Sequence, residues 1–302
     1  MTDRVQGSLA VFDDLRRKGR EAVKEGRLEE ALELYAEALE WARAQGDSRL
    51  IDRAFCGRTS VAIELGEIEG SLSELRQVLV RNNDPENCFL AAYNLGRAYE
   101  LGKANKKALF YARIARDRAE AIGSHEWIAS AHNLIGNMLL AESFFEEACR
   151  EYEEALQQLP VEPSVRRALI LDNLGYSYFV QDRRNEGLRL LFQSLRMLRR
   201  FGASRYEIFP RLSLCFAYLE IGRYERAIRY GRRALRAAEA LQDCESIKNA
   251  LYLLGEAANL SNDTDGAELY FRRLQRDYYP EADYLPDFLL AIDVRKLIHL
   301  KA

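Results

Sequence analysis

The stretch YNLGRAYELGKANKKALFYARIA at residues 93–115 returns in altered form as DNLGYSYFVQDRRNEGLRLLFQSL at residues 172–195. In the first stretch a small residue, Gly96, follows a leucine, and a second small residue, Ala108, comes twelve places later. Gly175 has the place of Gly96 in the second stretch. Residues three or four places apart lie on one face of a helix, and small residues allow two helix axes to approach closely. Each stretch therefore predicts two packed helices joined by a short turn.

The same pattern recurs along almost the whole chain. Aligning the small residue of each first helix gives seven anchor positions with spacings of 40, 37, 40, 39, 40 and 40 residues: Gly19, Thr59, Gly96, Gly136, Gly175, Cys215 and Gly255. A single helical hairpin cannot cover its own apolar face, so it must stack on its neighbours. The repeat therefore predicts an all-α solenoid of about seven helical hairpins.

The repeats divide the chain into an N-terminal segment, a superhelix and a terminal helix. We expect the segment at 1–11, the superhelix at 12–280 and a C-terminal capping helix at 281–302. The seven units are expected at about 12–47, 48–83, 86–122, 126–160, 164–202, 206–242 and 245–280. The terminal helix is predicted from apolar residues at helical spacing: Leu285, Phe288, Leu289, Ile292 and Leu297. It would cover the last hairpin, as solenoid ends require, and a surface for a partner or for self-association is the alternative.

Composition agrees with a helical protein that has a sizeable core. Of 302 residues, 48% are hydrophobic and 30% are charged, and the formal net charge is -3. The 18 glycines and 6 prolines are too few for an all-β chain with a turn at every short interval. No apolar run reaches the roughly 18 residues that a membrane helix needs, and the N-terminus has no apolar signal segment. We therefore expect a cytoplasmic protein without membrane insertion.

The residues that carry catalytic or metal chemistry are sparse. The five cysteines are at least 29 residues apart, so we expect buried, reduced thiols rather than a disulfide framework. His125 and His132 share a helical face, but no third ligand follows at a plausible spacing, so we expect no metal site. The chain has no phosphate-binding loop, HExxH motif or nucleophile elbow. We therefore predict a protein that is not an enzyme and has no cofactor.

The repeat resembles the tetratricopeptide repeat, with the signature W-x2-L-G-x2-Y, A-x3-F and P. The residues that carry the resemblance come from the third, fourth and fifth units: Leu95, Gly96, Tyr99, Ala108, Ile135, Gly136, Ala148, Tyr152, Pro160, Leu174, Gly175 and Tyr178. Two features depart from the family, because tryptophan never occupies the first position and the period is close to 40 rather than 34. The resemblance implies a right-handed superhelix whose first helices line a concave face.

The same resemblance implies a groove for a protein or peptide on that concave face. Its candidate residues are Tyr93, Asn94, Arg97, Asn133, Asn137, Asn173, Tyr176 and Tyr252. Asparagine is a poor helix former, so its recurrence in first helices needs a reason. An amide both donates and accepts, which suits the main chain of an extended peptide. The alternative is that these amides bridge adjacent helices or face water.

Positive charge gathers in the second half of the chain. Residues 183–236 contain fourteen arginines, no lysine and four acidic residues, a net charge of +10. Within this segment an arginine stripe steps by three, four and three residues along one second helix: Arg226, Arg229, Arg233 and Arg236. The guanidinium fork suits carboxylates and phosphates, so the arginine stripe predicts an acidic partner. A solvated outer face is the plain alternative, and nucleic acid fits less well.

We therefore predict a non-catalytic scaffold or adaptor that binds a protein or peptide in its concave groove. Two alternatives stay open at this point. The chain could be a peptide- or ligand-sensing module that acts through a separate effector, or a binder of an acidic partner or nucleic acid through its arginine-rich half. Fold resemblance alone does not select a partner.

Overall fold

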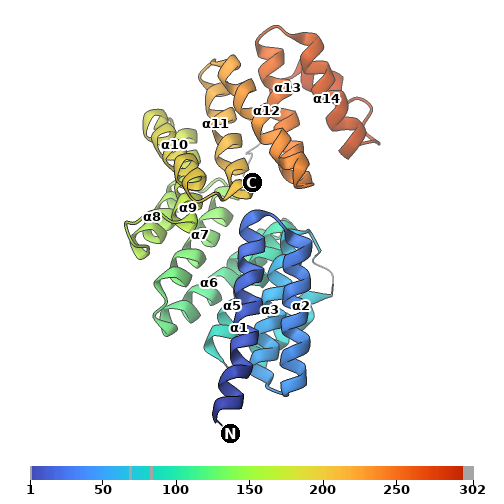
Figure 1. The fold of residues 1–302 in the computed structure, drawn as a ribbon. Helices are drawn as coiled ribbons and strands as arrows, with labels where there is room; N and C mark the ends of the chain where they lie inside the picture. The colour runs from blue at the N-terminus through green and yellow to red at the C-terminus, as the bar shows by residue number, and fades with distance from the viewer. Residues whose placement is uncertain (1, 68–69, 82–83, 295–302) are drawn as a thin grey trace. The chain divides into compact units, whose positions relative to one another are not determined.

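The computed structural model describes residues 2–67, 70–81 and 84–294, and every regular element in this part of the chain is helical (Figure 1). The chain divides into two compact units, residues 1–160 and 161–302. The boundary falls in the turn that follows Gln158, after the eighth helix. The all-α prediction is confirmed for the described residues, and each unit is a short α-solenoid of stacked hairpins.

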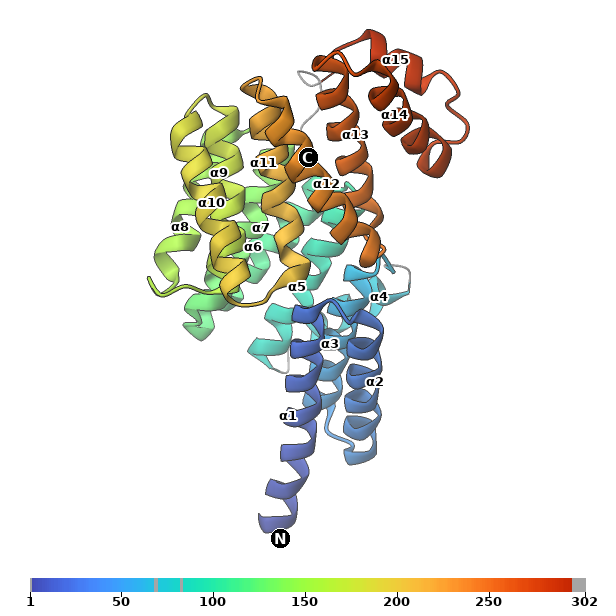
Figure 2. The ribbon, with the colours of Figure 1, turned by 45° about the horizontal axis from the view of Figure 1, so that its top comes forward.

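The first unit contains four helical hairpins. Their helices are α1 (Thr2–Glu25), α2 (Leu28–Gln45), α3 (Ser48–Glu64), α4 (Ser71–Arg81), α5 (Pro85–Leu101), α6 (Asn105–Ile122), α7 (His125–Ala141) and α8 (Phe145–Gln158). Because α1 begins at Thr2, the segment at 1–11 that we placed before the repeats belongs, from residue 2 onward, to the first helix. Both ribbon views show α1, α2 and α3 running side by side (Figures 1 and 2).

The second unit contains three hairpins and a short terminal helix. Its elements are α9 (Val165–Val180), α10 (Arg184–Arg200), the 3-10 turn η1 (Ser204–Glu207), α11 (Ile208–Glu220), α12 (Tyr224–Ala240), α13 (Cys244–Leu260), α14 (Thr264–Tyr278) and α15 (Leu285–Ala291). None of the described helices is both long and apolar enough to cross a membrane.

The helices of each unit pack in a regular order. Each second helix contacts its own first helix and the first helix of the next hairpin, as α6 does with α5 and α7. The first helices also contact one another, so that α1, α3, α5 and α7 form a row in the first unit, and α9, α11 and α13 form a row in the second. These two rows carry the groove residues that the sequence predicted.

Where the anchor of a first helix is glycine, a bulky side chain of a neighbouring helix lies against it. A Cβ atom placed on Gly136 would lie 2.6 Å from a ring carbon of Tyr152, and one on Gly255 would lie 2.3 Å from a ring carbon of Phe271. In both hairpins the ring belongs to the residue sixteen places after the anchor. This contact is the close approach that the spacing of small residues predicted.

The turn inside each hairpin uses one residue in the left-handed region. These residues are Gly26, Gly66, Lys103, Ser143, Asp182, Gly222 and Asn262, each seven places after an anchor. In the third hairpin the glycine does not take this position, because Gly102 has a φ of -78° and the next residue, Lys103, adopts the left-handed conformation with a φ of 55°. Several helices then begin with a side-chain cap; for example, Asp263 accepts a hydrogen bond from the backbone N–H of Gly266 at the start of α14.

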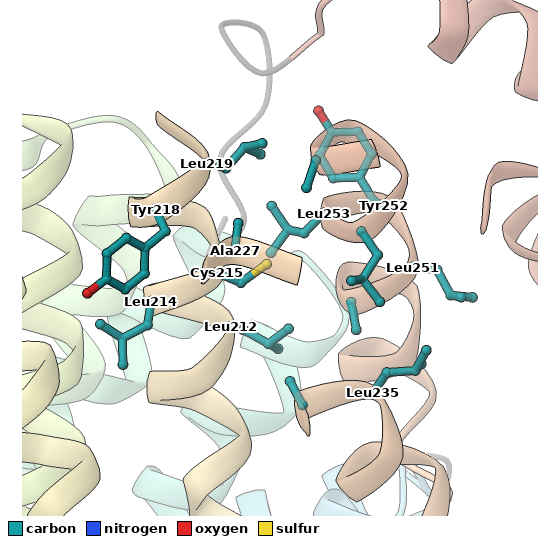
Figure 3. Close-up of a cluster of buried hydrophobic side chains, with 14 of the residues drawn as sticks. Leu212, Leu214, Cys215, Tyr218, Leu219, Ala227, Leu235, Leu251, Tyr252 and Leu253 are labelled. Carbon is teal, nitrogen blue, oxygen red and sulfur yellow. The ribbon is translucent and has the colours of Figure 1, made fainter. Parts of the chain in front are cut away.

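The core of the second unit lies between α11, α12 and α13. Figure 3 shows side chains from these three helices filling the space between them, with Cys215 of α11 close to Ala227 of α12 and Leu253 of α13. Cys215 is buried, and burial raises the pKa of its thiol to about 12. Four of the five cysteines are buried as expected, but Cys244 at the start of α13 is exposed.

The terminal helix is shorter than predicted. It ends at Ala291, and only Leu289 among its expected core residues is buried, while Leu285 is partly buried. Phe288, within the helix, and Ile292, directly after it, are exposed. Helix α15 still packs against α13 and α14, where Asn259 donates a hydrogen bond to the carbonyl of Leu290. Leu297 and the rest of the predicted cap, residues 295–302, lie outside the described residues.

Candidate functional site

Polar side chains link the first helices of the first unit into a continuous network. Arg97 of α5 forms an ion pair with Glu64 of α3. The Asn137 amide of α7 donates to Glu100 of α5 at 2.9 Å, and the hydroxyl of Tyr152 in α8 donates to the Asn137 carbonyl oxygen at 2.9 Å. The network therefore crosses from α3 through α5 and α7 to α8.

The charged side chains of the network are partly buried. Burial raises the pKa of Glu100 above its ordinary value, and the hydrogen bond from Asn137 and the charge of Arg97 only partly oppose that effect. Burial is the largest single effect on Arg97 and disfavours its charged guanidinium, but nearby Glu64, Tyr93 and Glu100 together outweigh it, so the net pKa of Arg97 is raised. Both side chains of the Arg97–Glu64 pair are partly buried, so desolvation offsets much of their attraction and the net contribution of the pair to stability is small.

Two asparagines in α5 bridge to the preceding first helix. Asn94 is buried and donates from its amide to the carbonyl of Cys56 at 2.7 Å. Asn87, two helical turns earlier, is also buried and donates to the carbonyl of Arg49 at 2.8 Å. Each bond spans 38 residues, about one hairpin. Asn94 therefore does not face an open surface as the groove hypothesis expected, since it satisfies a backbone carbonyl between helices.

Three other predicted groove residues of the first unit are partly exposed. Tyr93 and Arg97 lie on α5, and Asn133 lies on α7. The ring of Tyr93 stacks on Phe89 with 5.6 Å between centroids. Asn137 is also partly exposed, but its amide has two partners in the network described above.

A group of cations lies at the start of the same row. Arg16 and Arg20 of α1 lie near Arg53 of α3, and burial together with these two neighbours lowers the pKa of Arg16. The Tyr35 ring, wedged between two glycines, lies close to both arginines of α1. Arg53 and Glu64 belong to the second unit, whose anchor is Thr59 rather than glycine, and the repeat pattern did not single them out.

The corresponding row of the second unit is more apolar. Asn173 of α9 is partly exposed, whereas Tyr176 of α9 and Tyr252 of α13 are buried. The Tyr176 ring packs against Phe216 of α11 with 5.2 Å between centroids. The three predicted groove residues of this unit thus include two buried rings, Tyr176 directly after the anchor Gly175 and Tyr252 three places before the anchor Gly255.

The arginine stripe lies on α12, and all four of its residues are exposed. Arg226 places its guanidinium 5.5 Å from the ring centroid of Tyr218. Within the described residues, Arg229, Arg233 and Arg236 form no salt bridge, whereas Arg272 of α14 pairs with Glu268 in its own helix. Burial lowers the pKa of Arg211, and the nearby positive charges of Arg199 and Arg233 lower it further. The negative charge of Glu207 raises this pKa, but the net pKa of Arg211 is lowered.

His125 and His132 do not come together with other metal-ligand residues. The Nδ1 atom of His125 lies 2.8 Å from the side-chain oxygen of Gln158, and that of His132 lies 2.7 Å from a carboxylate oxygen of Glu151. Over residues 2–67, 70–81 and 84–294 no cluster of three or more histidine, cysteine or acidic side chains has the arrangement of a metal site.

Comparisons with known proteins point to one repeat family. Residues 17–45 and 217–282 each match a family model described as tetratricopeptide repeat. The outer dynein arm-docking complex subunit 4 of Danio rerio is 27% identical over 172 residues. That match covers 55% of this chain and 34% of the relative, so the chain spans about a third of the length of that curated relative.

Solved structures share the fold at low sequence identity. A Rap protein complexed with competence and sporulation factor is 14% identical with a TM-score of 0.72, over 94% of this chain and 79% of that chain. The Rap conjugation gene regulator of plasmid pLS20, in complex with the Phr* peptide, is 14% identical with a TM-score of 0.58, over 93% and 78%. At these identities the likeness concerns the fold alone.

Proposed function

Because the chain is a tetratricopeptide-repeat protein, we propose that it is a non-catalytic scaffold that binds a protein or an extended peptide along the first helices of its hairpins. The observation that carries the proposal is the row of first helices in each unit, with partly exposed amide and aromatic side chains on it. Tyr93 and Asn133 contribute from the first unit, and Asn173 contributes from the second.

The ligand that suits this row is a main chain in extended conformation. An amide that both donates and accepts can pair with a peptide group, and each such bond contributes about 1 kcal/mol net. The fold relative of plasmid pLS20 is in complex with a peptide, which supports a peptide as the ligand class here. Peptide sensing for a separate effector uses the same contacts, so it is a variant of this proposal.

The proposal is tested by selecting peptides that bind the full chain from a random library and measuring their Kd by calorimetry. Asn133→Ala and Asn173→Ala each remove one amide from the row. Each should therefore raise the Kd of a peptide bound along its unit about fivefold. Asn185→Ala is the matched control, because Asn185 is exposed on the second helix α10. Peptides bound with unchanged Kd by both row variants would contradict the proposal, and turnover of a bound peptide would contradict its non-catalytic part.

A second candidate function is docking of an acidic partner on the arginine stripe. The supporting observation is that three of its arginines, Arg229, Arg233 and Arg236, lack salt bridges among the described residues although other exposed arginines have them. Exposed, unneutralised guanidiniums in a row attract carboxylates over a distance set by ionic strength.

This second function is tested with a fluorescent polyglutamate peptide. Arg229→Glu combined with Arg233→Glu should weaken binding at low salt by about tenfold or more, since each reversal replaces attraction by repulsion. Arg272→Glu combined with Arg276→Glu on α14 makes the same change of net charge elsewhere in the unit and serves as control. Equal loss in both pairs would contradict a specific stripe, and preference for single-stranded DNA over polyglutamate would make nucleic acid the partner.

A further inference from the structure

A row of glutamates on α2 mirrors the arginine stripe. This glutamate row consists of Glu29, Glu33, Glu37 and Glu40, all of them exposed. None of the four forms a salt bridge among the described residues, whereas Glu30 on the same helix pairs with Arg27. Four like charges at helical spacing repel one another unless a cation lies opposite. The α2 row is therefore an unneutralised acidic face in the first unit.

Another acidic helix of the first unit lacks this continuity. Helix α8 carries exposed Glu146, Glu147 and Glu154, but Arg150 lies between them and places its guanidinium 3.8 Å from Glu146. The acidic surface of α8 is thus interrupted by a cation of its own. The α2 row has no such interruption between Glu29 and Glu40.

The two rows match in length and in spacing. The stripe on α12 advances by three, four and three residues, and the row on α2, read backwards from Glu40, advances by three, four and four. At 1.5 Å per residue the rows are about 15 Å and about 16.5 Å long. Read in either direction, the four charges can be aligned to within one residue, or about 1.5 Å, which is within the reach of flexible arginine and glutamate side chains.

We propose that the arginine stripe of one copy of this chain docks on the glutamate row of a second copy. This inference rests on the second candidate function, docking of an acidic partner on the stripe, and names that partner. The contact is heterologous, so two copies that use it reciprocally close a dimer, and copies that use it once each extend a chain. Each exposed pair is weak alone, so the association depends on all four and weakens with salt.

The experiment is sedimentation velocity of the full chain over about a hundredfold range of concentration, because association shifts with mass action. The wild type should form dimers or larger species at about 0.05 M salt and return to monomer near 0.5 M. Charge reversal of the stripe (R226E, R229E, R233E and R236E together), or of the row (E29K, E33K, E37K and E40K together), should weaken association at least about tenfold. Circular dichroism verifies that both variants keep their helices.

Mixing the two charge-reversed variants is the decisive arm. Each variant alone has two like-charged faces, but in the mixture the reversed stripe meets the reversed row, so association should return. Reversal of Glu146, Glu147 and Glu154 on α8 is the control and should leave association unchanged. A wild type that stays monomeric at every concentration overturns the inference, and so does a mixture that does not associate. If polyglutamate still binds the stripe in that case, the second candidate function stands and only the second copy is excluded.

Discussion

At the scale of single residues, the fold depends on pairs in which an aromatic ring packs directly against a glycine. The clearest pair joins Gly136 and Tyr152, because the ring lies where a Cβ would be and its hydroxyl donates to Asn137, the residue after the glycine. Tyr152 is fully buried, so its ring has no space into which it could withdraw. Packing and the polar network of the first unit are therefore coupled at one side chain.

Gly136→Ala is expected to destabilise the protein by about 1–3 kcal/mol, as for other overpacked cores. The new methyl would lie 2.6 Å from the Tyr152 ring, and moving the ring would also stretch its hydrogen bond to Asn137. The measurement is the free energy of unfolding in urea. Gly102→Ala is the control, because its nearest atom would be 3.5 Å away and its φ of -78° suits alanine. An equal loss in both variants would show that helix position, and not the ring contact, sets the cost.

Glu100 makes the stability of the first unit depend on pH. Burial raises its folded pKa above the unfolded value of 4.5, so the folded state binds the proton more tightly. The stability that Glu100 contributes is then complete below about 4.5 and is lost as pH rises through the folded pKa. Glu100→Gln removes this loss and still offers an oxygen to Asn137. The stability of the variant relative to the wild type should therefore increase between pH 4.5 and pH 7. A stability difference that does not change with pH would contradict a raised pKa.

At the scale of elements, each hairpin repeats one turn with different residues. The left-handed position is glycine in three of the seven hairpins, and Lys103, Ser143, Asp182 or Asn262 in the others. A side chain in this region costs energy because its Cβ meets the following carbonyl, and asparagine and aspartate tolerate it best. The turns are therefore not equally relaxed, although their backbones are alike.

Ser143→Gly is expected to stabilise the first unit by about 0.5–1 kcal/mol, since glycine adopts a positive φ without a steric penalty. Ser143 has a φ of 65° and is exposed, so the substitution removes little packing. Thermal unfolding followed by circular dichroism reports the gain as a higher Tm. Asn262→Gly changes the equivalent turn of α13 and α14 and should gain less, because asparagine already tolerates this conformation. A lower Tm for Ser143→Gly would contradict the strain.

The hairpins could be read from the sequence because helix periodicity and small-residue spacing are local properties. The hydrogen-bond partners of the asparagines could not be read from the sequence. Asn94 and Asn173 occupy the same place in their first helices, two residues before the anchor, yet Asn94 is buried with its amide on the carbonyl of Cys56 and Asn173 is partly exposed. The length of α15 was also missed, because apolar spacing continues past Ala291 although the helix does not. Interactions one repeat away therefore limited the prediction of the candidate site.

At the scale of the whole molecule, the chain consists of two units with different interiors. In the first, buried or partly buried polar groups such as Asn94 and Glu100 join successive first helices. In the second, a large apolar cluster runs from Phe179 to Val294 and includes side chains of α11, α12 and α13. Between the units, Val161 is 84% exposed and Pro163 is exposed in the connecting turn. Because each unit has its own core, each should keep its fold when this turn is cut.

This prediction is tested by inserting a specific protease site after Glu162 and cleaving the folded chain. Both fragments should retain their helical circular dichroism, because the cut removes no residue of either core. The same insertion after Gly222, in the turn between α11 and α12, is the control. That cut separates Cys215 from Gly231, which pack against each other within the apolar cluster, so helical signal should fall and the fragments should aggregate. Loss of helix after the cut at Glu162, with retention after the cut at Gly222, would place the cooperative boundary elsewhere in the chain.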